Sequence, residues 1–166
     1  MWTQTVDGFT VSARIEADDY NNAPWENDCG HGPVTGWERR EKRAGERVLC
    51  SDGFSKRFYD FAGAVRIARR DGWGCAGGRL PGETARAYAA RAAEADFQRL
   101  RAWCNDEWRY VGVVLSVSRN GVLLERLAAS LWGIESDAED HLAKIAEELL
   151  PEAIERGREV LTALLR

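Results

Sequence analysis

The stretch 108–134, WRYVGVVLSVSRNGVLLERLAASLWGI, decides the fold because its pattern predicts an antiparallel hairpin. Asn120-Gly121 divides the stretch, and this dipeptide accepts the two positive φ angles of a tight primed turn. Apolar residues alternate with small or polar ones from Val111 to Ser118, as in a half-buried strand. After the turn the parity of the apolar residues shifts near Arg126, which predicts a β-bulge. We therefore expect this hairpin at the centre of a sheet.

Further strands are predicted nearer the N-terminus. Residues 2–17 form a hairpin pattern, with Asp7-Gly8 as the turn and strict alternation from Phe9 onward. Residues 37–43 and 46–50 are interpreted as two short strands. Between these regions, residues 18–36 have the composition of a loop, and whether it is ordered stays open.

Three helical segments follow from apolar spacing and capping residues. The first begins after Asp60 and stops at Gly72, and the second covers 83–107. The third begins after Ser136, an N-cap candidate with Glu139 in the capping-box position, and Pro151 is expected to break or kink it.

These elements predict an α+β fold, an antiparallel sheet built from hairpins and packed on one face by helices. The glycine-rich connection 72–82 separates two halves that each hold few apolar residues. We therefore expect residues 1–166 to form one domain.

Composition restricts the class of protein. The 166 residues carry a net charge of -4, and 45% are hydrophobic, as in a globular protein. Apolar runs are too short for a membrane span, and Met1-Trp2-Thr3 leads into polar residues rather than a secretory signal. The four cysteines are scattered rather than spaced as in a disulfide-rich scaffold, which favours reduced thiols. We expect a cytoplasmic protein that does not contact a membrane.

The middle of the chain is basic. Residues 36–79 hold 11 basic and 6 acidic side chains, interleaved with aromatic rings, as in single-strand binders. The residues that would contact nucleic acid are Arg43, Arg47, Lys56, Arg57, Arg66, Arg69 and Arg70. The alternative is that neighbouring acids neutralise these cations as surface pairs, and the net negative charge favours this alternative over a dedicated nucleic-acid binder.

Seven tryptophans are many for this length, and large rings and guanidinium groups dominate binding interfaces. We expect a protein partner to contact a set of residues near the loop: Trp25, His31, Trp37, Arg39, Arg40 and Trp73. Any of these tryptophans is equally compatible with a place in the core.

Two chemical alternatives involve His31. With Cys29, Cys50 and Cys75 it has the donor types of a zinc site, but the cysteines lack the close pairs typical of zinc modules. With Asp28 it has the composition of a general-base pair, but no nucleophile motif accompanies it. We therefore expect no catalytic residue, metal or other cofactor.

Four blocks together resemble small accessory proteins of temperate phages and prophages of proteobacteria. They are Gly30-His31-Gly32-Pro33 with Trp37, 57–61 with 71–73, 96–108, and 130–135. The resemblance implies no site residue. It implies that the chain binds a host protein or protein–nucleic-acid complex, as an inhibitor of a nucleic-acid-processing defence system of the anti-CRISPR or anti-restriction class. The alternatives are direct nucleic-acid binding and a small metal- or acid/base-dependent enzyme. The sequence identifies neither the partner nor the oligomeric state.

Overall fold

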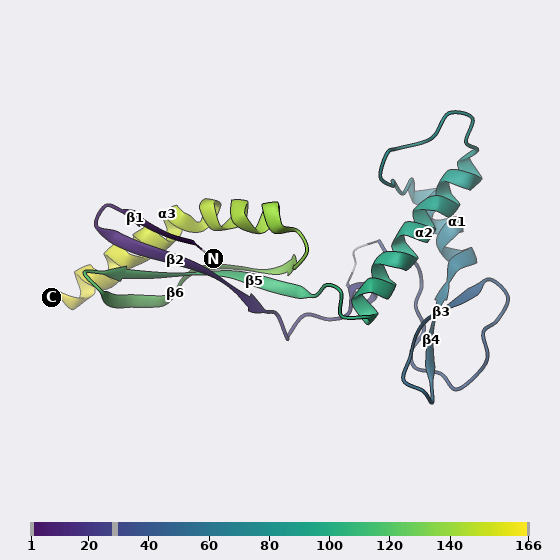
Figure 1. Cartoon of the computed structure of the whole chain (residues 1–166), viewed down its shortest axis with the longest axis horizontal. Coiled ribbons are helices and arrows are strands. Elements are labelled where there is room, and N and C mark those ends of the chain that lie inside the picture. The colour runs from purple at the N-terminus through teal and green to yellow at the C-terminus, as the bar shows by residue number, and fades with distance from the viewer. Residues whose placement is uncertain (1, 28–29, 166) are drawn as a thin grey trace. The chain divides into compact units, whose positions relative to one another are not determined.

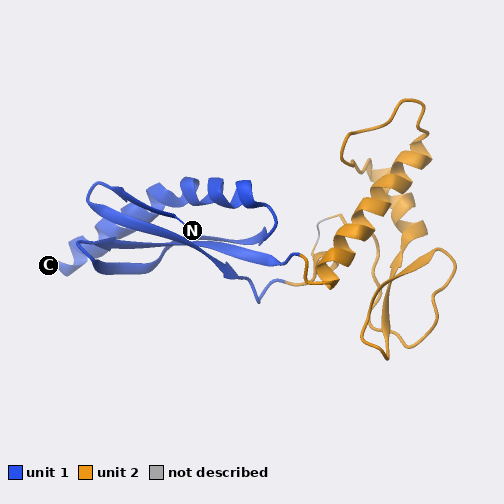
Figure 2. Ribbon diagram, in the orientation of Figure 1, with its two compact units in different colours: residues 1–21, 108–166 blue, residues 22–107 orange. Residues whose placement is uncertain are grey.

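The chain forms two compact units in the computed structural model, which describes residues 2–27 and 30–165 (Figure 2). Unit 1 comprises residues 1–21 and 108–166, and unit 2 comprises residues 22–107. Unit 2 is therefore an insertion between two segments of unit 1. That residues 1–166 form a single α+β domain stays a prediction.

Unit 1 contains a four-stranded antiparallel sheet in the order β1-β2-β5-β6. Its strands are β1 (Trp2–Val6), β2 (Phe9–Ala17), β5 (Tyr110–Arg119) and β6 (Val122–Glu135). The two predicted hairpins are confirmed, and both central turn residues have positive φ in each, with 50° at Asn120 and 78° at Gly121. The β5–β6 register shifts between Leu115 and Val117, opposite Ala129 and Glu125, so the bulge predicted near Arg126 is also present.

One face of this sheet is covered by α3 (Glu139–Leu164) (Figure 1). Alternation along β2 and β5 directs their apolar residues toward the helix, where they form the core of unit 1 with Leu142, Ile145 and Ile154. The strand residues of this core include Phe9, Val11, Ala13, Val111, Val113, Leu115 and Val117. The predicted α+β class, an antiparallel sheet of hairpins with helical packing, is confirmed.

The start of α3 differs from the prediction. Ala138 occupies the N-cap position without a side-chain cap, and the Ser136 hydroxyl instead accepts a hydrogen bond from the Arg109 backbone N–H at 3.0 Å. Ser136 thus continues the β5–β6 ladder, a tertiary role that local sequence does not reveal. The helix also passes through Pro151 without a break, so the possibility of a break at this residue was wrong. The buried residues on both sides of Pro151 hold the two parts against the sheet.

Unit 2 combines a β-hairpin with two helices. Its elements are η1 (Pro24–Glu26), β3 (Glu46–Ser51), β4 (Lys56–Asp60), α1 (Phe61–Asp71) and α2 (Ala85–Cys104). Asp60 caps α1 by accepting from the Gly63 N–H, and Gly72 ends the helix in the left-handed region at φ 68°, both as predicted. The expected strand at 37–43 was wrong: this segment contributes one isolated bridge, Glu38 to Lys56. Five consecutive charged side chains at 38–42 are better suited to a solvated loop.

The core of unit 2 lies between the hairpin and the helix pair. Six buried residues form it: Leu49, Tyr59, Ala64, Ala93, Phe97 and Leu100. Small residues on both helices let α1 and α2 approach closely, and this packing positions the side chains described below. Within the described part of the chain, no helix is long and apolar enough to cross a membrane.

A substitution at Gly157 tests the packing of α3. A Cβ added there would lie 2.9 Å from Val117 Cγ2 and 3.2 Å from the Phe9 ring. We expect Gly157→Val to lower the free energy of unfolding by about 1–3 kcal/mol through overpacking, as measured by urea denaturation. Glu152→Val, at an exposed position of the same helix, is the control and should change stability by about 0.5 kcal/mol or less. Equal effects of the two variants would contradict the close packing.

Candidate functional site

One polar cluster of unit 2 is centred on Asp96. Its Oδ1 lies 2.5 Å from His31 Nδ1. Its Oδ2 accepts hydrogen bonds from the Gly32 N–H at 2.8 Å and from the Tyr59 hydroxyl at 2.7 Å. One carboxylate thus binds the loop before β3, strand β4 and helix α2 together. Charge-assisted hydrogen bonds of this kind are the stronger ones in proteins.

The positions of Asp96, Tyr59 and Gly32 follow from the local sequence and packing. Asp96 follows Ala93 by three positions on α2 and directly precedes Phe97, so it lies at the edge of the apolar stripe. Tyr59 is fully buried and packs against the Phe97 ring, with 5.5 Å between ring centroids. Gly32 is required because an added Cβ would collide with the Tyr59 side chain. The loop residues 31 and 32 therefore fit only against this tyrosine and this carboxylate.

The electrostatics of the cluster favour a neutral Tyr59. Burial raises the pKa of Tyr59 above its ordinary value, and the hydrogen bond to Asp96 raises it further. The phenol therefore remains a donor to Asp96. His31 is half-buried, and the contact of its Nδ1 with Asp96 fixes the plane of the imidazole ring.

Asp96 is the residue that sequence reasoning missed. The predicted carboxylate partner of His31 was Asp28, and Asp28 and Cys29 both lie outside the described residues. A signal was available, since Asp96 interrupts the apolar stripe of a helix otherwise lined by Ala93, Phe97 and Leu100. The hydrogen bonds of this cluster, as far as residues 2–27 and 30–165 show them, include no serine, threonine or cysteine nucleophile.

The predicted partner-binding tryptophans lie in different environments. Trp25 is half-buried and meets Trp103 edge to face at 5.1 Å. Trp73 is half-buried and packs against the core. Trp37 is 47% exposed, and the Arg57 guanidinium lies 4.9 Å from its ring and 5.3 Å from that of Trp25. Of the three, only Trp37 is classed as exposed.

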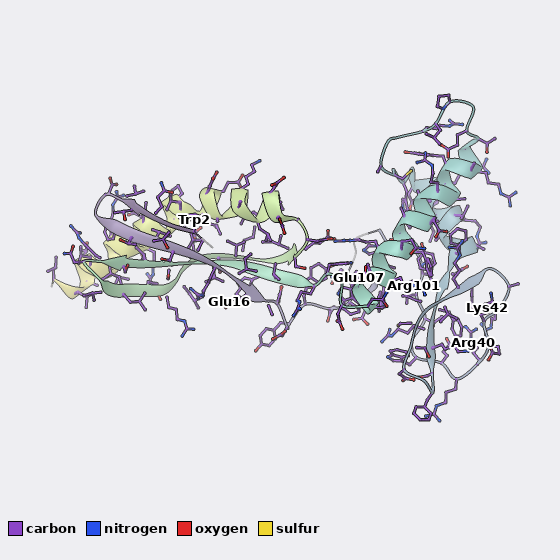
Figure 3. The ribbon with its side chains drawn as sticks, viewed as in Figure 1. Trp2, Glu16, Arg40, Lys42, Arg101 and Glu107 are labelled. Atoms are coloured by element: carbon purple, nitrogen blue, oxygen red, sulfur yellow. The ribbon has the colours of Figure 1, made fainter. Side chains whose placement is uncertain are left out.

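The two predicted partner-binding arginines also differ. Arg40 forms a two-pronged ion pair with Glu46 at 2.7 and 2.8 Å and lies over the Phe58 ring. This pairing, with a bond from the Arg43 N–H, lowers the pKa of Glu46 to about 2. Arg39 is exposed. Arg40 and Lys42 both belong to the loop before β3, seen in Figure 3.

The residues of the nucleic-acid alternative are mostly engaged within unit 2. Arg47 pairs with Glu94, Lys56 with Glu41, and Arg70 with Asp71. Arg57 is held between two tryptophans, and Arg66 lies 3.8 Å from Asp60. Arg43 and Arg69 are exposed. The basic segment therefore is not one continuous cationic surface, because acids and rings of the same unit cover much of it.

The cysteines do not assemble with His31 into a metal centre in the described part of the chain. Cys50, Cys75 and Cys104 are half-buried free thiols. Among the residues that the structure describes, no group of three or more histidine, cysteine or acidic side chains is placed to hold a metal ion. Burial, followed by an interaction with Cys50, raises the pKa of Cys104 to about 12.

The Asp96 cluster can be tested through Tyr59. Tyr59→Phe removes one of the hydrogen bonds to the carboxylate, and we expect a loss of about 1.5–3 kcal/mol in the free energy of unfolding. Urea denaturation measures the change. Tyr20→Phe, at a fully exposed tyrosine, is the matched control and should be neutral. A neutral Tyr59→Phe would contradict a stabilising role for this bond.

The raised pKa of Cys104 predicts low reactivity. Burial raises the pKa of Cys104 far above pH 8, so the thiol form predominates there, and the thiolate is the form that reacts. We expect iodoacetamide to leave Cys104 unmodified in the folded protein and to alkylate it in urea, as peptide mass spectrometry would show. Alkylation at equal rates in both states would contradict the assignment.

Comparison with known proteins assigns no family to this geometry. No protein-family model matches the chain, and neither a curated protein nor a solved structure matches it.

Proposed function

We propose that the chain acts by binding another protein, and that a segment of this partner adds to the sheet of unit 1 beside β6. The observation that carries the proposal is the character of this strand. β6 has 14 residues and lies at an edge, with β5 as its neighbour in the described sheet. An edge strand presents unpaired backbone groups to which an extended segment can bond.

The exposed side chains of β6 are unusually apolar for an edge. Five large ones are between 41 and 62% exposed: Val122, Leu123, Leu127, Leu131 and Trp132. The segment 127–134 contains no charged residue. Natural edge strands are normally protected by charge, proline, short length or β-bulges, and of these the segment 127–134 has only a shift in its register with β5. Burial of each large apolar side chain contributes about 1.5–3 kcal/mol to the free energy of binding, so any three of these five would hold a partner segment.

The opposite edge of the same sheet serves as a comparison. β1 has five residues, and Thr3 and Thr5 lie beside hydroxyls of β2, at 3.2 Å from Ser12 and 3.4 Å from Thr10. This edge is short and polar, as expected for a solvated strand. The contrast between the two edges favours a binding role for β6 over incidental exposure.

The class of partner is proposed from the resemblance to phage accessory proteins. We propose that it is a host protein of a nucleic-acid-processing defence system. The exposed Trp37 and Arg39 of unit 2 are further candidate contacts, whereas Arg40 is already paired. Trp25 and Trp73 support the shape of unit 2 from half-buried positions.

The experiment compares charges introduced at the two edges. We expect Leu127→Lys with Leu131→Lys to weaken binding of a captured host protein about tenfold or more, because the apolar contact is lost. Thr3→Lys with Thr5→Lys adds the same charge at the β1 edge and should retain binding. Affinity is measured with the purified partner, and hydrogen exchange should show new protection at residues 127–134. Retained binding by the β6 variant, or occupation of β6 by a second copy of this chain, would contradict the proposal.

A further inference from the structure

A groove of about 480 Å³ runs between α1 and α2 in unit 2. Its floor is apolar, from Phe61, Ala62, Val65 and Ala90, and its charged lining residues are Arg66, Arg69 and Arg86. The groove exists because alanines at the helix contact, Ala68 and Ala89 among them, bring the two backbones together and leave the longer side chains at the rim.

Both walls of this groove carry guanidinium groups. Arg66 and Arg69 are three positions apart on α1, so they lie on one face of that helix. Arg86 is in the first turn of α2, on the other wall. No acidic side chain is among the lining residues. The groove is therefore positive along its length, although the sequence of the whole chain is negative.

These arginines differ from the others of unit 2 in their lack of partners. Arg40, Arg47 and Arg91 each form an ion pair shorter than 3 Å. By contrast, the side chains of Arg69 and Arg86 form no hydrogen bond or ion pair with any described residue. Arg66 has a 3.8 Å approach to Asp60, whose carboxylate already caps α1. All three arginines are exposed, so their guanidinium groups are accessible to an anion that enters the groove.

We propose that this groove binds the phosphodiester backbone of a single-stranded nucleic acid. Guanidinium forks on two walls match phosphate oxygens, and an apolar floor accepts the sugars and bases of one strand. An acidic peptide would match the charge but has no planar bases to lie against the apolar floor, and competition by poly-glutamate separates the two in the test below. The site is distinct from β6 and does not depend on the function proposed for that strand.

The test measures binding of a fluorescent oligothymidylate of about 20 nucleotides by anisotropy at about 50 and 200 mM salt. We expect Arg66→Ala, Arg69→Ala and Arg86→Ala combined to weaken binding about tenfold or more at the lower salt. The slope of log affinity against log salt should fall by about 2, since three phosphate contacts are lost and each contributes about 0.7.

The matched control removes the same charge from the loop before β3. Arg39→Ala, Lys42→Ala and Arg43→Ala together should change the affinity less than about threefold, because these exposed residues lie outside the groove. Circular dichroism verifies that both triple variants are folded. An equal loss of oligonucleotide affinity in the two triple variants would show nonspecific electrostatic attraction and overturn the proposal. So would the absence of oligonucleotide binding, tighter binding of a duplex, or equal competition by poly-glutamate or inorganic phosphate.

Discussion

The pairing of β2 with β5 is the interaction on which the rest of unit 1 depends. Eight residue pairs, from Thr10–Ser118 to Ala17–Val111, join segments separated by the whole of unit 2. The two local hairpins become one sheet only through this pairing, and α3 finds its apolar face only on the joined strands. A long-range pairing of this kind has a large loop-closure entropy to overcome, so we expect it to form more slowly than the two local hairpins.

Unit 2 depends on a different kind of interaction, a half-buried carboxylate with several hydrogen-bond partners. Asp96 ties the long loop at His31 and Gly32 to α2 and Tyr59. Because an unpartnered carboxylate or phenol would be unfavourable in this position, the cluster selects one loop conformation and also stabilises unit 2. The same contact holds the His31 ring against α2.

Local patterns in the sequence were sufficient for most of the fold. Asn120-Gly121 and Asp7-Gly8 fix turn geometry through their own φ angles, and Asp60 and Gly72 bound α1 for equally local reasons. Two predictions were wrong. Ser136 does not cap α3, because its hydroxyl forms a tertiary hydrogen bond with the Arg109 N–H, and residues 37–43 do not form a strand, because their charges favour solvent. At the candidate site, His31 was singled out, but Asp96 lies 65 positions away, and such a partner requires the packing of α2 to be known. The same applies to Arg86, which joins Arg66 and Arg69 only when the helices are paired.

The place of the insertion has a consequence for how such a chain can diversify. The strands on either side of unit 2 remain bonded up to Asp18 and Tyr110, where the Asp18 N–H donates to the Tyr110 carbonyl at 3.0 Å. The chain thus leaves and re-enters the sheet at neighbouring points, and the register is set without reference to what lies between. Because each doubling of a connecting loop changes its closure entropy by only about 0.6 kcal/mol, the inserted sequence can be exchanged or resized with little effect on the scaffold. Recombination could therefore supply new recognition elements at this position while the strand order and the helix beneath it are inherited intact.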